Sequence, residues 1–169
     1  QSNMAMKLSG GGSQPVDRSL ASMMMSSRYA DRIRFFNVEN AVSDTLCRDV
    51  KSLGWTRCDP ATVGDLSAVA YYFATYLTES LDVPVGVMVN AWGGSKIEAW
   101  MDRATYEESV SGTRPQEEKR NNRRPAGIFN AMVYPLTSYV AKGFLWYQGE
   151  GNKEYPELYE KQMPLMVTS

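Results

Sequence analysis

A helix followed at once by a buried strand is the feature that most limits how this chain can fold. Asp65 can cap a helix that runs to Leu81, and residues 84–89 then form an almost wholly apolar run, as expected of a strand covered on both faces in a parallel sheet. Parallel strands need crossover connections, which place helices on the faces of the sheet. The pattern therefore predicts an α/β fold with a parallel sheet. The apolar residues at helical spacing on one face of the predicted helix are Leu66, Val69, Ala70, Phe73, Leu77 and Leu81.

Other segments continue this alternation of strands and helices. Residues 32–38 alternate and are rich in aromatic and β-branched side chains, and residues 143–147 are wholly apolar, so both segments are predicted to be strands. Shorter helices are predicted at residues 97–101 and 128–139, with Pro135 kinking or shortening the second. A last helix, residues 155–164, is predicted to end near Pro164.

Three segments lack a periodic pattern. The Gly/Ser stretch from Ser9 to Gln14 is predicted to be a loop, and residues 44–62 are predicted to be a long loop that carries Trp55. Residues 113–124 are charged and have no apolar face, which is typical of a surface linker or excursion. The chain is interpreted as a single domain spanning residues 1–169.

Composition excludes several classes of partner. With 18 Lys and Arg against 19 Asp and Glu, the net charge is −1, and no basic cluster is long enough to follow a nucleic acid. No apolar run approaches the roughly 20 residues that span a bilayer. A nucleotide cofactor is poorly supported because no Gly-rich phosphate loop follows a strand, and no metal is expected. Cys47 and Cys58 can form one disulfide, but free, small core residues are favoured.

The sequence contains no histidine, the side chain most often used as a general base near neutral pH. Either this protein performs no such chemistry or the chain is incomplete.

Three polar motifs stand out, and two of them lie where α/β proteins place their chemistry. Gln1–Met4 is a Gln-Ser-Asn-Met sequence, Trp92–Ser95 is a Trp-Gly-Gly-Ser loop, and Trp146–Asn152 contains Gln-Gly-Glu. The last two come directly after predicted strands, whose carboxyl ends carry the ligand sites of such sheets. Each motif alone has an ordinary explanation as a cap, a turn or a solvated polar group.

Together, in this order, the motifs resemble the sialic-acid-specific acetylesterase family of carbohydrate esterases, a branch of the SGNH (GDSL-like) hydrolases. Two small departures are Gly151, where Ser or Ala is expected, and Lys96, where Pro or Ser is common. The resemblance implies a three-layer α/β/α sandwich with a parallel sheet. The segments that carry it are residues 1–4, 66–73, 83–86, 92–100, 129–132, 135–136 and 146–152.

The resemblance also offers a reason for the missing histidine. Members of the family begin with a strand before the serine motif and supply the histidine from a late Asp-x-x-His segment. The chain is therefore expected to be a fragment that lacks the first strand and the C-terminal part, with the remainder of the same polypeptide supplying the catalytic histidine. Family analogy suggests a periplasmic or secreted protein.

The resemblance implies a role for each motif. Ser2 is the expected nucleophile, and its own backbone N–H, that of Gly94 and the Gln148 amide are the expected oxyanion donors. Whether Gly93 or Gly94 directs its N–H inward is left open. Glu150 either orients the missing histidine or is a structural carboxylate near a helix start. The expected substrate contacts are Trp92, Gly93 and Asn152, and Trp146 is favoured as a core residue.

Three functions follow as alternatives. The first is a serine hydrolase that removes O-acetyl groups from acetylated sugars, most of all from sialic acid. The second is an acetylxylan esterase of the same superfamily, because the two share the serine motif and the Gln-Gly-Glu block. The third is a carbohydrate-binding module that keeps the fold without catalysis, as the absent histidine suggests.

Overall fold

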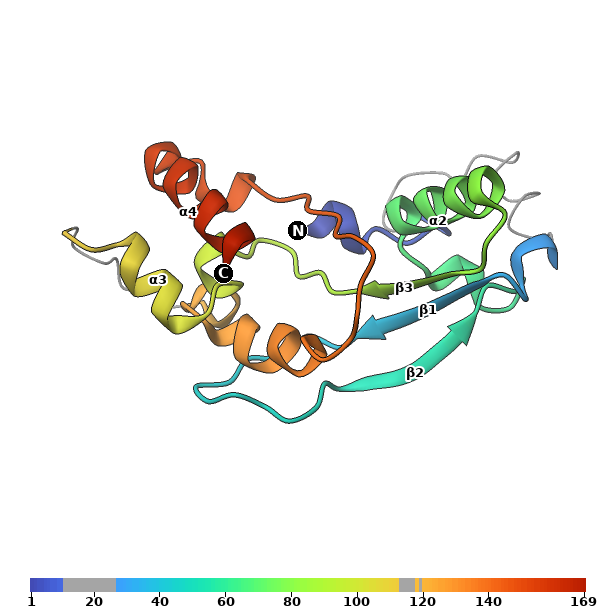
Figure 1. The fold of residues 1–169 in the computed structure, drawn as a ribbon, viewed down its shortest axis with the longest axis horizontal. Helices are drawn as coiled ribbons and strands as arrows, with labels where there is room; N and C mark the ends of the chain where they lie inside the picture. Colours follow the sequence, from blue (N-terminus) through green and yellow to red (C-terminus); the bar gives the residue numbers. More distant parts are fainter. Residues whose placement is uncertain (11–26, 113–117, 119) are drawn as a thin grey trace. The chain divides into compact units, whose positions relative to one another are not determined.

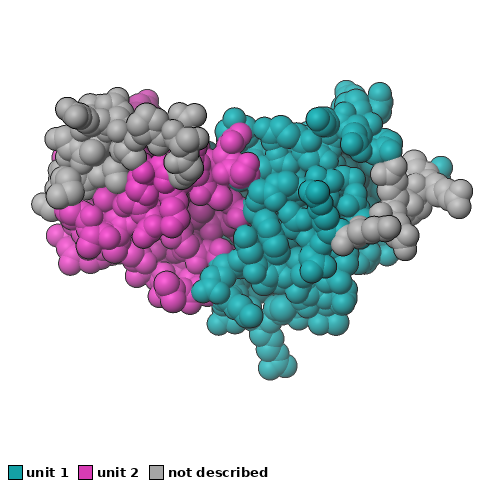
Figure 2. All heavy atoms as spheres, turned by 180° about the vertical axis from the view of Figure 1, so that it is seen from behind, with its two compact units in different colours: residues 1, 39–51, 92–169 teal, residues 2–38, 52–91 magenta. Residues whose placement is uncertain are grey.

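The computed structural model describes residues 1–10, 27–112, 118 and 120–169, which form two compact units (Figure 2). Unit 1 comprises residues 1, 39–51 and 92–169, and unit 2 comprises residues 2–38 and 52–91. Parts of two predicted loops, those of residues 9–14 and 113–124, lie outside the described residues.

Unit 2 is built on a three-stranded sheet in the order β2-β1-β3 (Figure 1). Strand β1 (Ile33–Val38) pairs in parallel with β3 (Val85–Val89), and α2 (Ala68–Leu81) lies in the connection between them. A parallel pair joined through a helix confirms the predicted α/β class. The buried core of unit 2 lies between α2 and the sheet and includes Phe35 and Tyr71.

Strand β2 (Ser52–Arg57) was not predicted, because its sequence lay in the expected loop of residues 44–62. It pairs antiparallel with β1 at the edge of the sheet, so the sheet is mixed. Its larger apolar side chains lie on the solvent side, since Leu53 is 96% exposed and Trp55 is also exposed. The sequence pattern therefore does not indicate a strand with a buried apolar face. Gly54, at φ +84°, further interrupts the strand pattern.

Helix α2 confirms the predicted helix with two corrections. Its N-cap is Ser67, whose Oγ accepts the Ala70 N–H at 3.2 Å, while Asp65 lies in a preceding turn and pairs with Lys7. The buried face is also rotated from the prediction, because Phe73 is 40% exposed. Small residues let the helix approach the sheet closely, and the buried positions are Ala68, Ala70, Tyr71, Ala74, Thr75 and Thr78.

The regular elements of unit 1 are helices and helical turns. Helix α3 (Arg103–Ser109) begins at Asp102, whose carboxylate accepts the N–H groups of the first turn, and α4 (Pro156–Thr168) packs beside α3. The predicted helix of residues 128–139 is present as a π-helical turn, Phe129–Val133, followed by a short 3₁₀ turn. The 3₁₀ turns of the described chain are Ser2–Ala5, Ser27–Tyr29, Val63–Asp65, Ile97–Ala99, Asn121–Arg123, Tyr134–Leu136 and Glu150–Asn152.

Two predictions for the C-terminal part of the chain are wrong. Residues 143–147 form no strand, because no described segment pairs with them. A strand needs a neighbouring strand as the partner of its backbone hydrogen bonds. Trp146, favoured as a core residue, is 36% exposed. Helix α4 does not end near Pro164 but continues to Thr168, because one proline removes one backbone donor and the flanking turns still form.

Both cysteines are free thiols, and Cys58 is a buried core residue as expected, whereas Cys47 is only half-buried. No helix within the described ranges is both long and apolar enough to cross a membrane.

Candidate active site

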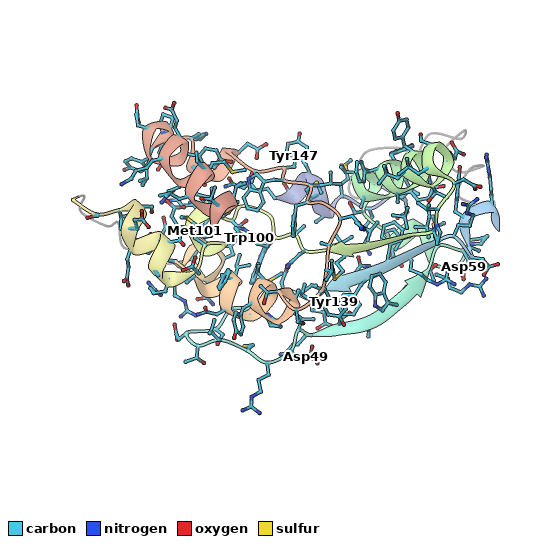
Figure 3. The ribbon with its side chains drawn as sticks, viewed as in Figure 1. Asp49, Asp59, Trp100, Met101, Tyr139 and Tyr147 are labelled. Carbon is cyan, nitrogen blue, oxygen red and sulfur yellow. The ribbon has the colours of Figure 1, made fainter. Side chains whose placement is uncertain are left out.

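The Trp92–Ser95 loop of unit 1 is a tight turn closed by its last residue. The Ser95 N–H and Ser95 Oγ both donate to the Trp92 carbonyl, at 3.4 and 2.8 Å. Gly94 has φ +71°, a conformation that residues with a side chain rarely adopt. Trp100, labelled in Figure 3, donates its indole N–H to Ser95 Oγ at 2.9 Å. These bonds hold the Trp92 and Ser95 ends of the turn in place, while Gly94 itself stays exposed.

A separate 3₁₀ turn, Asn121–Arg123, donates hydrogen bonds to the Gly93 and Gly94 carbonyl groups of this loop. Asn122 donates from Nδ2 to the Gly93 carbonyl at 2.8 Å, and Arg123 donates from Nε to the Gly94 carbonyl at 2.9 Å. Both residues come from the segment predicted to be a surface excursion. The described part of that segment is thus a structural support of the glycine loop.

The Ser95 carbonyl oxygen joins the first and last motifs. It accepts the Gln1 side-chain amide at 2.8 Å and the Gln148 amide at 3.2 Å, and Ser95 is fully buried. The Gln1 backbone nitrogen also donates to the Tyr147 carbonyl at 2.8 Å. Gln1, the residue before Ser2 in the chain, is therefore tied to unit 1 by both its side chain and its backbone.

A partly buried chain of hydrogen bonds runs from Gln148 through Asn152 to Glu98. Asn152 Oδ1 accepts from Gln148 Nε2 at 2.7 Å and from the Ile97 N–H at 2.9 Å. Asn152 Nδ2 donates to Glu98 Oε2 at 2.8 Å. Asn152 is only 5% exposed, so its polar atoms serve neighbouring residues. Burial raises the pKa of Tyr106, and the Glu98 carboxylate raises it further.

Gly151 is the position where the sequence departs from the expected Ser or Ala. A Cβ atom there would lie closer than 3.0 Å to the Ser95 carbonyl oxygen and 2.7 Å from Gln1 Nε2. The glycine therefore permits a close approach of two backbone segments.

Lys96, the other departure from the expected pattern, is buried. Its ammonium group pairs with the Glu118 carboxylate, and the two side chains are 8% and 17% exposed. This ion pair adjoins the glycine loop in sequence and links it to the segment that carries Asn122.

The expected catalytic side chains are placed as follows. Gln148 lies within the Ser95–Asn152 network, and the Glu150 side chain is exposed with no hydrogen-bond partner among the described residues. The backbone hydrogen bonds needed for a purely structural Glu150 are thus not found there. Ser2 belongs to unit 2, is exposed, and begins a 3₁₀ turn. Trp92 and Gly93 are half-buried.

Sequence reasoning missed Glu98, Asn122 and the Lys96–Glu118 pair. Glu98 lies inside the 92–100 segment that carries the resemblance, so its position could have marked it as a candidate site residue. Asn122 stands among basic residues that look like solvated surface, and no local pattern marks it as a partner of Gly93.

Comparison with known proteins gives one family. All 169 residues match the family described as carbohydrate esterase, sialic acid-specific acetylesterase. Human sialate O-acetylesterase is 32% identical over 106 residues, which are 60% of this chain and 20% of that protein. The mouse sialate O-acetylesterase is 28% identical over 172 residues, 80% of this chain and 32% of that protein.

A solved structure of a carbohydrate acetylesterase is also similar to this chain. The crystal structure of a carbohydrate acetylesterase from Xanthomonas citri matches with a TM-score of 0.82 and 30% identity, over 98% of this chain and 34% of that one. The chain thus spans about a third or less of the length of these relatives. A match across the whole chain, with its three motifs in order, shows that this chain belongs to the sialic acid-specific acetylesterase family of carbohydrate esterases.

Proposed function

We propose that the polypeptide carrying this chain is a serine hydrolase that removes O-acetyl groups from acetylated sugars. The observation that carries the proposal is an exposed turn whose Gly94 N–H has no acceptor among the described residues, within a chain of an esterase family. Such a free backbone donor suits the negative charge that develops on an ester oxygen during acyl transfer.

The proposed reaction begins at Ser2. Its Oγ forms a bond to the acetyl carbonyl carbon as a base takes the hydroxyl proton, and the carbonyl oxygen becomes an oxyanion. When the tetrahedral intermediate collapses, the C–O bond to the sugar breaks and the sugar oxygen takes the proton. Water then releases acetate from the acetyl-serine by the same steps. The chain has no histidine, so the imidazole base must come from outside these 169 residues.

The proposed donors to the oxyanion are the N–H groups of Gly94 and Ser2, with the Gln148 amide as a further candidate. Both amide hydrogens of Gln148 are engaged, by the Ser95 carbonyl and by Asn152. Gln148 can therefore reach an oxyanion only by giving up one of these bonds, and the 3.2 Å bond to Ser95 is the longer.

Other site residues take supporting roles in the proposal. An exposed Glu150 with no hydrogen bond in the described chain is available to orient an incoming histidine. Trp92 and Gly93, both half-buried, can contact the sugar. Asn152 is buried with its polar atoms occupied, which favours positioning Gln148 over touching substrate.

The substrate class is proposed from the relatives. The curated relatives are sialate O-acetylesterases, and the X. citri protein is a carbohydrate acetylesterase. Acetylated sialic acid is therefore the first substrate to test, and acetylated xylan represents the wider class.

The test measures acetate release by the longest natural polypeptide that carries these residues. Ser2→Ala should lower turnover by about 10⁴-fold or more with an unchanged melting temperature, as removal of a nucleophilic serine does elsewhere. Ser9→Ala, an exposed serine of the same unit, is the matched control and should keep full turnover. The 169-residue chain alone should release almost no acetate, because it lacks an imidazole base.

Two results would contradict the proposal. Normal turnover by Ser2→Ala would remove Ser2 as nucleophile. Tight binding of acetylated sugars with no acetate release by the longer polypeptide would favour a carbohydrate-binding module.

A further inference from the structure

The φ angles of the Trp92–Ser95 loop fit a type II turn. The Ser95 N–H reaches the Trp92 carbonyl, Gly94 has φ +71°, and Gly93, the other central residue, does not have a positive φ. A type II turn requires a positive φ only at the third of its four residues, which here is Gly94.

The central peptide of this turn carries the Gly93 carbonyl and the Gly94 N–H. In a trans peptide these two groups point in opposite directions. Type I and type II turns differ mainly by a rotation of this one peptide, which reverses both groups. Because both central residues are glycines, no side chain opposes either state. The sequence of the turn alone therefore leaves the direction of the Gly94 N–H undetermined.

Asn122 supplies the missing constraint. Its Nδ2 donates to the Gly93 carbonyl at 2.8 Å, which holds that carbonyl toward the Asn121–Arg123 turn and directs the Gly94 N–H the opposite way. The Arg123 N–H closes this turn on the Arg120 carbonyl at 3.0 Å, and Arg124 pairs with Asp44 at 3.2 Å. Asn122 is thus presented from an anchored element.

We propose that Asn122 is a positioning residue that holds the Gly93–Gly94 peptide in the type II state, so that the Gly94 N–H stays available to the oxyanion. The catalytic part of this inference rests on the proposed esterase function. The proposal takes Gly94 rather than Gly93 as the donor, because the Gly94 N–H belongs to the peptide whose carbonyl Asn122 holds.

Arg123 provides a matched control within the same turn. Its hydrogen bond goes to the Gly94 carbonyl, which belongs to the next peptide, between Gly94 and Ser95. That peptide is also held by the Ser95 N–H bond to Trp92. Loss of the Arg123 bond should therefore leave the central peptide in place, whereas loss of the Asn122 bond should release it.

The first experiment measures the peptide itself and needs no catalysis. In the ¹⁵N-labelled form of the longest natural polypeptide that carries these residues, Asn122→Ala should shift or exchange-broaden the Gly94 amide resonance on the microsecond-to-millisecond scale. Arg123→Ala should leave the Gly94 amide sharp. A Gly94 amide that is unaltered in Asn122→Ala, with the chain folded, would overturn the proposal whether or not the protein is an esterase.

The second experiment measures kcat and KM for acetate release by the longest natural polypeptide. Asn122→Ala should lower kcat by about 2- to 10-fold, the population change expected from losing one neutral hydrogen bond. Asn122→Asp sets a carboxylate against the Gly93 carbonyl and should approach the 10²-fold loss typical of a missing oxyanion donor. KM should stay unchanged in both variants, and Arg123→Ala should stay within about twofold of the parent in kcat, as a bond outside the central peptide predicts.

A purely structural role gives a different pattern. If Asn122→Ala and Asn122→Asp lower the melting temperature but leave kcat of the folded fraction unchanged, the catalytic part of the inference is wrong. If Arg123→Ala lowers kcat as much as Asn122→Ala does, the central peptide is not the element being held.

Discussion

Asn152→Ala removes the centre of the buried network in unit 1 and should destabilise the chain strongly. The substitution leaves the Ile97 N–H without an acceptor, and Ile97 is fully buried. A buried unsatisfied donor costs about 1–3 kcal/mol. The Glu98 carboxylate also loses an amide donor, and it is only partly accessible to water. Together these losses should lower the free energy of unfolding by about 2–4 kcal/mol.

Urea unfolding followed by tryptophan fluorescence checks this value. With a slope of about 2 kcal/mol per molar, the transition midpoint should fall by about 1–2 M at an unchanged slope. Asn121→Ala is the matched control, because Asn121 is exposed and no side-chain partner is found for it in the described chain. A midpoint for Asn152→Ala that stays within 0.3 M, roughly the error of the method, would refute the claim that this network stabilises unit 1.

Asn152→Asp separates the two ends of the network. The new carboxylate keeps an acceptor for the Ile97 N–H but faces the Glu98 carboxylate in place of an amide donor. Two adjacent carboxylates raise the pKa of one of them in the folded state. This variant should therefore be destabilised at neutral pH and should recover toward the parent as the pH falls through the raised pKa.

Three further predictions concern packing, a buried ion pair and a thiol. Gly151→Ala should lower the free energy of unfolding by about 1–3 kcal/mol because its Cβ meets backbone atoms, whereas Gly143→Ala, which opens into free space, should not; urea midpoints give both values. Lys96→Met should cost about 3–5 kcal/mol by leaving the Glu118 carboxylate unpaired, and adding Glu118→Leu should restore much of it in a double-mutant cycle. Burial raises the pKa of Cys58 from 9.0 to about 11, so between these pH values the native thiol stays protonated while the unfolded one ionises. The urea midpoint should therefore decrease as the pH rises from about 9 to about 11, and it should decrease less steeply in Cys58→Ala.

The sequence predicted the parts of the fold that depend on local pattern. Strand β1, helix α2 and strand β3 were recognised because their periodicity matches their element, and these three define the parallel unit. Strand β2 was missed because it is held by pairing with β1, with its larger side chains turned outward. The strand predicted at residues 143–147 is absent, since an apolar run does not become a strand without a partner for its backbone.

The sequence named candidate site residues but not the hydrogen bonds that join them. The glycine loop and the Gln-Gly-Glu segment meet at the Ser95 carbonyl, which accepts the Gln148 amide. No sequence pattern could indicate that Asn122 bonds to Gly93, because this contact depends on where a charged segment returns to the loop. Hydrogen-bond partners distant in sequence follow from tertiary placement, so local patterns cannot reveal them.

The orientation of the Gln148 amide decides which donors an oxyanion can use. Exchanging its oxygen and nitrogen would set the oxygen against two acceptors, the Ser95 carbonyl and Asn152 Oδ1. Asn152 cannot turn to accommodate this, because the Ile97 N–H needs its oxygen and the Glu98 carboxylate needs its amide. In the proposed mechanism, Gln148 must therefore exchange an existing hydrogen bond for one to the oxyanion. The exposed Gly94 N–H needs no such exchange, so in that mechanism we expect the orientation of a single glycine peptide to influence turnover more than Gln148 does.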